Sequence, residues 1–90
     1  MKKTGQFITD IENSLFNRIL NFRDIQDVSN ETEIKVITLK SIILKNEKIT
    51  TDNYAGYNGL LRKCLQKIEE SLTFFEKAKS ELSEMLPKVS

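Results

Sequence analysis

Between Thr51 and Lys63, the residue types and their spacing suit ligand binding better than anywhere else in the sequence. Two tyrosines, two glycines and two basic side chains lie close together there. Glycine lets a ligand or another backbone approach closely, aromatic rings form walls, and basic groups attract an anion. With one further lysine just upstream, the sequence predicts a ligand- or partner-binding site formed by Lys48, Tyr54, Gly56, Tyr57, Gly59, Arg62 and Lys63.

The two glycines leave other interpretations open. If a helix starts at Thr51, Gly56 and Gly59 fall on its outer face, where each costs about 0.8 to 1 kcal/mol relative to alanine. A helix that starts later would make Asn58-Gly59 a turn. A third interpretation is a helix-turn-helix motif, with residues 51–63 as a DNA-recognition helix.

Charge is distributed unevenly along the chain, although the formal net charge is only +1. Residues 34–68 carry seven basic and two acidic side chains, a net charge of +5, and the segments on either side each carry −2. The middle of the chain therefore suits an anionic small molecule. The sequence pI of about 7.8 is low for a DNA-binding protein, so nucleic acid is the weaker expectation.

Catalysis is not expected from this composition. The chain has no histidine and one cysteine, which excludes imidazole chemistry and an internal disulfide and argues against the usual zinc sites. Cys64 lies among apolar residues at helical spacing, which indicates a packing role rather than a nucleophile. We predict a protein that is not an enzyme and that holds no cofactor and no metal.

Part of the same segment resembles a known family. Thr51-Asp52, Gly56-Tyr57, Leu60 and Arg62 are similar to a short helical stretch of the phage-encoded anti-CBASS sponge family. The sequence departs from that stretch at residues 53–54, where Asn-Tyr replaces a leucine-glutamine pair. The resemblance implies a small helical oligomer that sequesters a cyclic oligonucleotide signal.

Hydrophobic periodicity predicts an all-α protein. Apolar residues at helical spacing indicate helices over about residues 5–26, 31–46 and 51–86. Asn30 and Thr51-Asp52 suit the starts of the second and third helices, and Pro87 ends the third. The expected fold is a single domain, residues 1–90, forming a three-helix antiparallel bundle with a long C-terminal helix.

The apolar faces are wider than one such bundle can cover. Tyr54 to Met85 carries a seam spaced three and four residues apart, and the segment 31–46 is apolar almost all round a helical wheel. A second chain is the natural cover. We therefore predict a homo-oligomer, with an interface formed by Val36, Leu39, Ile43, Leu61, Cys64, Ile68 and Phe75.

These observations favour a non-enzymatic, oligomeric binding protein that regulates or inhibits a protein partner, as phage and mobile-element accessory proteins do. The first alternative is a sponge for an anionic small molecule such as a cyclic nucleotide, and the second is a dimeric helix-turn-helix DNA-binding regulator. The longest apolar runs are far shorter than a membrane span, and no apolar signal core follows Met1. We expect a cytoplasmic protein without membrane contact.

Overall fold

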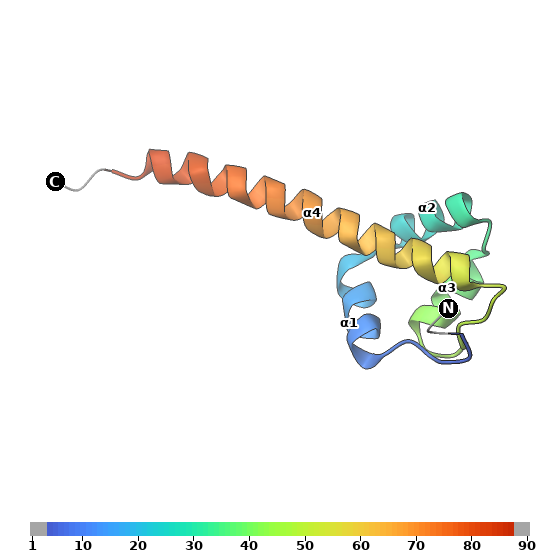
Figure 1. Ribbon diagram of the computed structural model, residues 1–90. Helices are drawn as coiled ribbons and strands as arrows, with labels where there is room; N and C mark the ends of the chain where they lie inside the picture. The colour runs from blue at the N-terminus through green and yellow to red at the C-terminus, as the bar shows by residue number, and fades with distance from the viewer. Residues whose placement is uncertain (1–3, 88–90) are drawn as a thin grey trace.

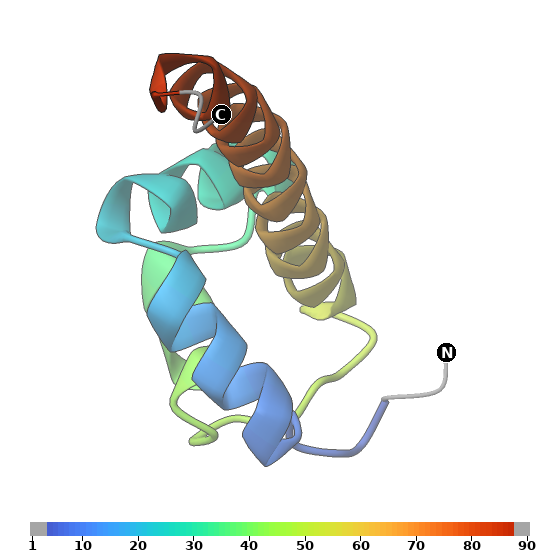
Figure 2. The ribbon, with the colours of Figure 1, turned by 90° about the vertical axis from the view of Figure 1, so that its left-hand side faces the viewer.

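The computed structural model describes residues 4–87 and contains four helices in that range, with no strand among these residues. They are α1 (Asp10–Ile19), α2 (Phe22–Thr32), α3 (Val36–Ile43) and α4 (Tyr54–Met85). The three short helices lie to one side of α4 and pack against its N-terminal half (Figures 1 and 2). The all-α prediction is confirmed, and the number of helices is four rather than three.

The first expected helix, residues 5–26, is broken in two by a capping box. The chain becomes extended at Leu20, and the Asn21 side chain accepts from the backbone N–H of Asp24 at 2.9 Å. In return, the Asp24 carboxylate accepts from the backbone N–H of Asn21, also at 2.9 Å. This exchange satisfies backbone donors that start a new helix. A similar box between Thr9 and Glu12 starts α1, so the expected start near residue 5 is also corrected.

The second expected helix, residues 31–46, is shorter and starts later. Asn30, the expected cap, lies within α2. That helix ends at Glu33, whose φ of 63° is in the left-handed region and turns the chain away. The helix α3 then occupies only Val36–Ile43, and a ten-residue connection, residues 44–53, leads to α4.

Asn53, rather than Thr51-Asp52, precedes the long helix and organises the connection before it. Its buried side chain accepts from the backbone N–H of Thr50 at 2.8 Å. Its amide nitrogen donates to the Glu47 carboxylate and to the Lys48 carbonyl, both at 3.0 Å. The loop is therefore held by one polar side chain inside the fold, as buried polar groups require.

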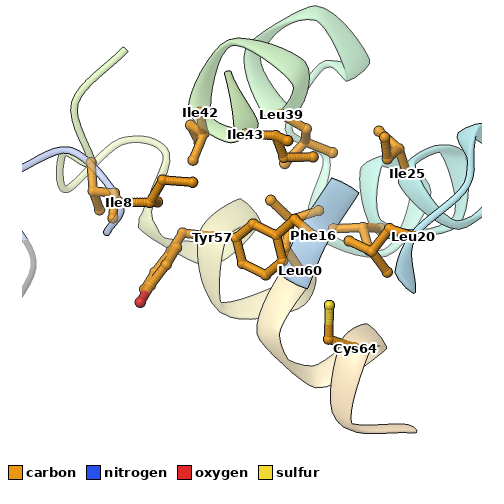
Figure 3. Close-up of a cluster of buried hydrophobic side chains, with 12 residues drawn as sticks. Ile8, Phe16, Leu20, Ile25, Leu39, Ile42, Ile43, Tyr57, Leu60 and Cys64 are labelled. Carbon is orange, nitrogen blue, oxygen red and sulfur yellow. The ribbon is translucent and has the colours of Figure 1, made fainter. Parts of the chain in front are cut away.

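The hydrophobic core lies between the short helices and the first three turns of α4 (Figure 3). In Figure 3 the α3 side chains Leu39, Ile42 and Ile43 face Tyr57 and Leu60 of α4. Phe16 from α1 and Ile25 from α2 lie in the same buried cluster. We call residues 4–68, which contain this core, the head.

The remainder of α4 extends away from the head (Figure 1). Every residue from Glu69 to Leu86 is exposed except Ala78, which is half-buried. We call residues 69–86 the arm. Because of the arm, the chain measures 62 × 25 × 20 Å, with a radius of gyration of 17.5 Å.

Candidate functional site

The predicted tyrosine walls belong to the head rather than to a ligand pocket. Tyr57 is only 4 % exposed, and its hydroxyl donates to the Glu12 carboxylate of α1. Burial, together with that carboxylate, raises the pKa of Tyr57 above its usual value. Tyr54 is half-buried beside it, with a ring-centroid distance of 5.9 Å. Tyr57 therefore joins α4 to α1, and Tyr54 packs beside it.

Both glycines lie on the buried face of α4, so the expectation that they face outward is wrong. A Cβ at Gly56 would be 2.7 Å from Leu39 Cδ2, and one at Gly59 would be 2.8 Å from Val28 Cγ1. At these distances a methyl group would fit only if the neighbouring side chains, or the backbone that carries them, moved. Gly59 lies inside the helix, so Asn58-Gly59 is not a turn either. Close approach is indeed the role of these glycines, but the approaching groups are side chains of the same chain.

The three predicted cationic residues, Lys48, Arg62 and Lys63, do not meet at one place. Lys63 forms an ion pair with Asp27 of α2 at 3.2 Å. The Lys48 ammonium lies 5.6 Å from the centroid of the Phe7 ring, within the range of a cation–π contact. Arg62 is exposed. The predicted site is therefore not assembled as one pocket: its residues mostly hold the head together.

The helix-turn-helix interpretation meets a different geometry. That motif joins its two helices by three or four residues, whereas ten residues separate α3 from α4. Asn53, which falls within the segment 51–63 taken as a recognition helix, is 4 % exposed, and its side chain makes the loop contacts described above.

The predicted oligomer interface divides into three groups. Leu39, Ile43 and Cys64 are at most 6 % exposed and are covered by helices of the same chain, which corrects their assignment as interface residues. Val36 and Leu61 are half-buried at the edge of the core. Ile68 and Phe75 are 38 % and 64 % exposed and continue onto the arm. Only this last pair is open to another chain.

Cys64 has a packing role, as its place among apolar residues predicted, because its side chain is buried in the core. Burial raises the pKa of its thiol to about 11, so the nucleophilic thiolate is scarce at neutral pH.

One turn away from Cys64, Lys67 forms an ion pair with Asp24 at 2.5 Å. Burial opposes ionisation of Asp24, but the hydrogen bonds and charges from Lys67 and Asn21 outweigh it, so its pKa is lowered.

An exposed apolar stripe lies along α4. Counted from Leu61, alternating steps of four and three residues place seven apolar side chains and one lysine on one face, which is the a/d pattern of a coiled coil. We call this set the arm stripe: Leu61, Leu65, Ile68, Leu72, Phe75, Lys79, Leu82 and Leu86. From Leu65 onward its apolar members are 38 to 68 % exposed.

The predicted seam and the arm stripe have four residues in common, one every seven positions: Leu61, Ile68, Phe75 and Leu82. The two sets differ in the residues that lie between these four. The seam passes through Cys64, Ser71 and Ala78, whereas the stripe passes through Leu65 and Leu72 on the neighbouring column. In the sequence, the feature that indicated the stripe was the larger apolar side chains of Leu65 and Leu72, compared with those of Cys64, Ser71 and Ala78. A periodic pattern alone cannot show which of two adjacent columns faces the same chain.

Two open grooves follow the stripe. One, of about 360 Å³, lies where α4 leaves the head and is lined by Arg18 and Ile19 of α1 together with Lys67, Ile68, Ser71, Leu72 and Phe75. The other, of about 600 Å³, lies along the last three turns of α4 and has an almost entirely apolar lining, with Phe75, Leu82, Met85 and Leu86 among its residues.

Comparison with known proteins assigns no family to this chain. No family model, no curated protein and no solved structure matches the chain. Within residues 4–87, no helix has the length and hydropathy needed to cross a bilayer. The same residues contain no group of three or more cysteine or acidic side chains placed to hold a metal ion.

Proposed function

We propose that this is a non-enzymatic binding protein of the small oligomeric regulator or inhibitor type, and that it associates with other helices through the arm. The observation that carries the proposal is the arm stripe, a row of large apolar side chains on a helix that leaves the head. A continuous exposed apolar surface of this kind is typical of an interaction site.

The amount of exposed surface supports the proposal. A compact monomer of this mass exposes about 5,400 Å² and has a radius of gyration of about 12 Å. This chain exposes 6,810 Å², and its radius of gyration is 17.5 Å. A standard interface covers roughly 800 Å² on each partner. The surplus surface is therefore large enough for such an interface.

The stability of the arm gives a second reason. Most of the stability of helices in proteins comes from the packing of one apolar face rather than from helix propensity. Residues 69–85 form a helix that is exposed almost throughout, and among residues 4–87 the groove beside Arg18 and Ile19 of α1 borders only its first turns. A partner helix on the stripe would supply the missing packing and would hold the arm in the helical state.

Catalysis has little support in the head. Its one thiol is buried with a raised pKa, and the Tyr57 hydroxyl is held by Glu12. The residues that suggested an anion site act mainly in packing, so no observation favours the sponge over a protein-binding role.

Sedimentation velocity of the purified chain, from about 1 µM to about 300 µM, tests the proposal. We expect concentration-dependent association that Phe75→Glu abolishes, because the substitution places a charge in the stripe. Thr73→Glu is the matched control: it adds the same charge to an exposed arm position outside the stripe and should leave association intact. A wild-type chain that stays monomeric throughout, with rapid hydrogen exchange over residues 69–85, would contradict the proposal.

A further inference from the structure

Charge is divided between the two halves of α4. Residues 54–68 carry three basic and no acidic side chains, whereas residues 69–85 carry five acidic and two basic ones. The helix macrodipole favours the opposite distribution, with acids near the N-terminus and bases near the C-terminus. The arrangement therefore does not serve the isolated helix, and it makes each end of α4 complementary to the other end of a second copy.

We propose that the arm stripe pairs with the arm stripe of a second copy of this chain in an antiparallel coiled coil. This inference rests on the proposed function, because it names the partner of the surface described there. The stripe extends for about three heptads, from Leu65 to Leu86, which is long enough to specify a coiled coil.

The heptad positions fix the register. In an antiparallel pair, each a position faces a d position, so Leu65 faces the partner's Leu82 and Leu72 faces the partner's Phe75. The centre of the pair lies between residues 73 and 74. At one edge of the pair near this centre, Ser71 and the partner's Ala78 lie close to each other, and their small side chains let the two helices approach closely.

Lys79 discriminates between the two possible orientations. In the antiparallel register it faces the partner's Ile68 and lies next to the partner's Glu69. In a parallel pair it would face the partner's Lys79 across the seam, with like charges together. The antiparallel register also brings Glu69 near the partner's Glu76, and Lys79 lies beside this acidic pair and offsets its repulsion.

The head end of the pair has basic side chains that no acidic group in the described part of the chain occupies. The last turns of the partner's arm would lie along the part of α4 that carries Arg62. Arg18 of α1 borders the same groove at the base of the arm. Arg18 and Arg62 are both exposed and form no ion pair among residues 4–87, so their charges are available to a second chain.

Disulfide trapping tests the orientation in the full chain. In a Cys64→Ala background, Leu65→Cys and Leu82→Cys are prepared as two separate proteins, then oxidised alone and as an equimolar mixture. In the antiparallel register, each cysteine is about 26 Å along the axis from its own copy, since 17 residues separate the two layers. We therefore expect cross-linked dimer only in the mixture. Ser80→Cys, on the outer face of the arm, should cross-link neither alone nor with either variant.

A second measurement leaves every leucine of the stripe in place and changes only charged residues. Lys79→Glu should weaken dimerisation by at least about tenfold, because it places a third carboxylate beside Glu69 and Glu76. A double variant adds Glu69→Lys to this change. The double variant should restore the affinity to near the wild-type value. Lys77→Glu, an equal charge change at an outer position, should have little effect.

The outcomes separate this inference from the proposed function. Cross-linking of each variant with itself, or of none in a chain that still associates through Phe75, would overturn the antiparallel register and leave the proposed function standing. Failure of the double variant to recover would likewise overturn it. A chain that does not associate at all would contradict both.

Discussion

The two halves of α4 show how one helix can have two sources of stability. In the head half, Tyr57, Leu60 and Cys64 are at most 6 % exposed and are packed by α1, α2 and α3. In the arm half, Leu72 and Leu82 are more than half exposed. The hydrogen-bond ladder of the helix continues across the boundary, so the difference lies in the packing alone. The head is stabilised within the chain, and the arm requires a second surface.

Placing a charge in the head should have the largest effect. Ile43→Asp puts a carboxylate at a position that is 5 % exposed, and we expect it to unfold the head, with a loss of at least about 4 kcal/mol. Ile37→Asp is the matched control on the same helix at 71 % exposure, and it should change stability by less than about 0.5 kcal/mol. Urea denaturation followed by circular dichroism compares the two, and a folded Ile43→Asp protein would contradict the assignment of the core.

Truncating one leucine in each half of α4 makes the comparison direct. Leu60→Ala leaves a cavity at a fully buried site and should cost about 2 to 5 kcal/mol. Leu82→Ala, measured at a concentration where the chain is monomeric, should change the unfolding of the head by less than about 0.5 kcal/mol. Equal losses in the two variants would show that the arm packs within the monomer.

Adding one methyl group tests how closely α2 approaches α4. Gly59→Ala should destabilise the head by about 1 to 3 kcal/mol, because its Cβ would lie 2.8 Å from Val28 Cγ1. The usual gain in helix propensity from such a substitution is smaller than this cost. Combined with Val28→Ala, the loss should be less than the sum of the two single losses. A stabilised Gly59→Ala protein would mean that the two helices are farther apart.

Removing the Asp24–Lys67 ion pair should have the smallest effect on the stability of the head, and this effect should depend on pH. Because the folded-state pKa of Asp24 is lowered, its contribution is present above the unfolded pKa of about 3.9 and is lost as the pH falls below it. Asp24→Asn should cost about 1 to 2 kcal/mol at pH 7, and its difference in stability from the wild type should shrink as the pH falls from 7 toward 2 and through the folded-state pKa of Asp24.

Asp10→Asn is the control for that pH dependence. The hydrogen bond to Lys45 also lowers the pKa of Asp10, but the carboxylate is fully exposed, so little stability should depend on it. Thermal denaturation across this pH range compares the two variants. An acid profile that Asp24→Asn leaves unchanged would show that this pair does not contribute to acid sensitivity.

The sequence predicted the helical class and the long last helix well, because both depend on strong periodicity. The last helix was expected over 51–86 and is observed over Tyr54–Met85. The break between α1 and α2 was missed, because apolar spacing continues through Phe22 and Ile25. The signal was present in polar residues instead: Asn21 and Asp24 have the types and the spacing of a capping box.

The candidate site could not be predicted in the same way, because composition does not show what a residue contacts. Tyrosines, glycines and cations near one another suggested a ligand, yet Gly56 and Gly59 make room for the chain's own side chains, and Lys63 meets Asp27. Glu33 was missed as the end of α2 because its left-handed φ is one that few non-glycine residues adopt. These side-chain contacts and this backbone conformation are determined by packing over the whole fold.

The length of the arm has a consequence for valency. If two arms pair about a centre between residues 73 and 74, the Leu60 side chains of the two heads lie about 40 Å apart along the helix axis. The dimer would then be a dumbbell that presents two identical heads at its opposite ends. Any surface that a head offers to a target would then be present twice, and a target with two matching copies would gain affinity by engaging both heads at once.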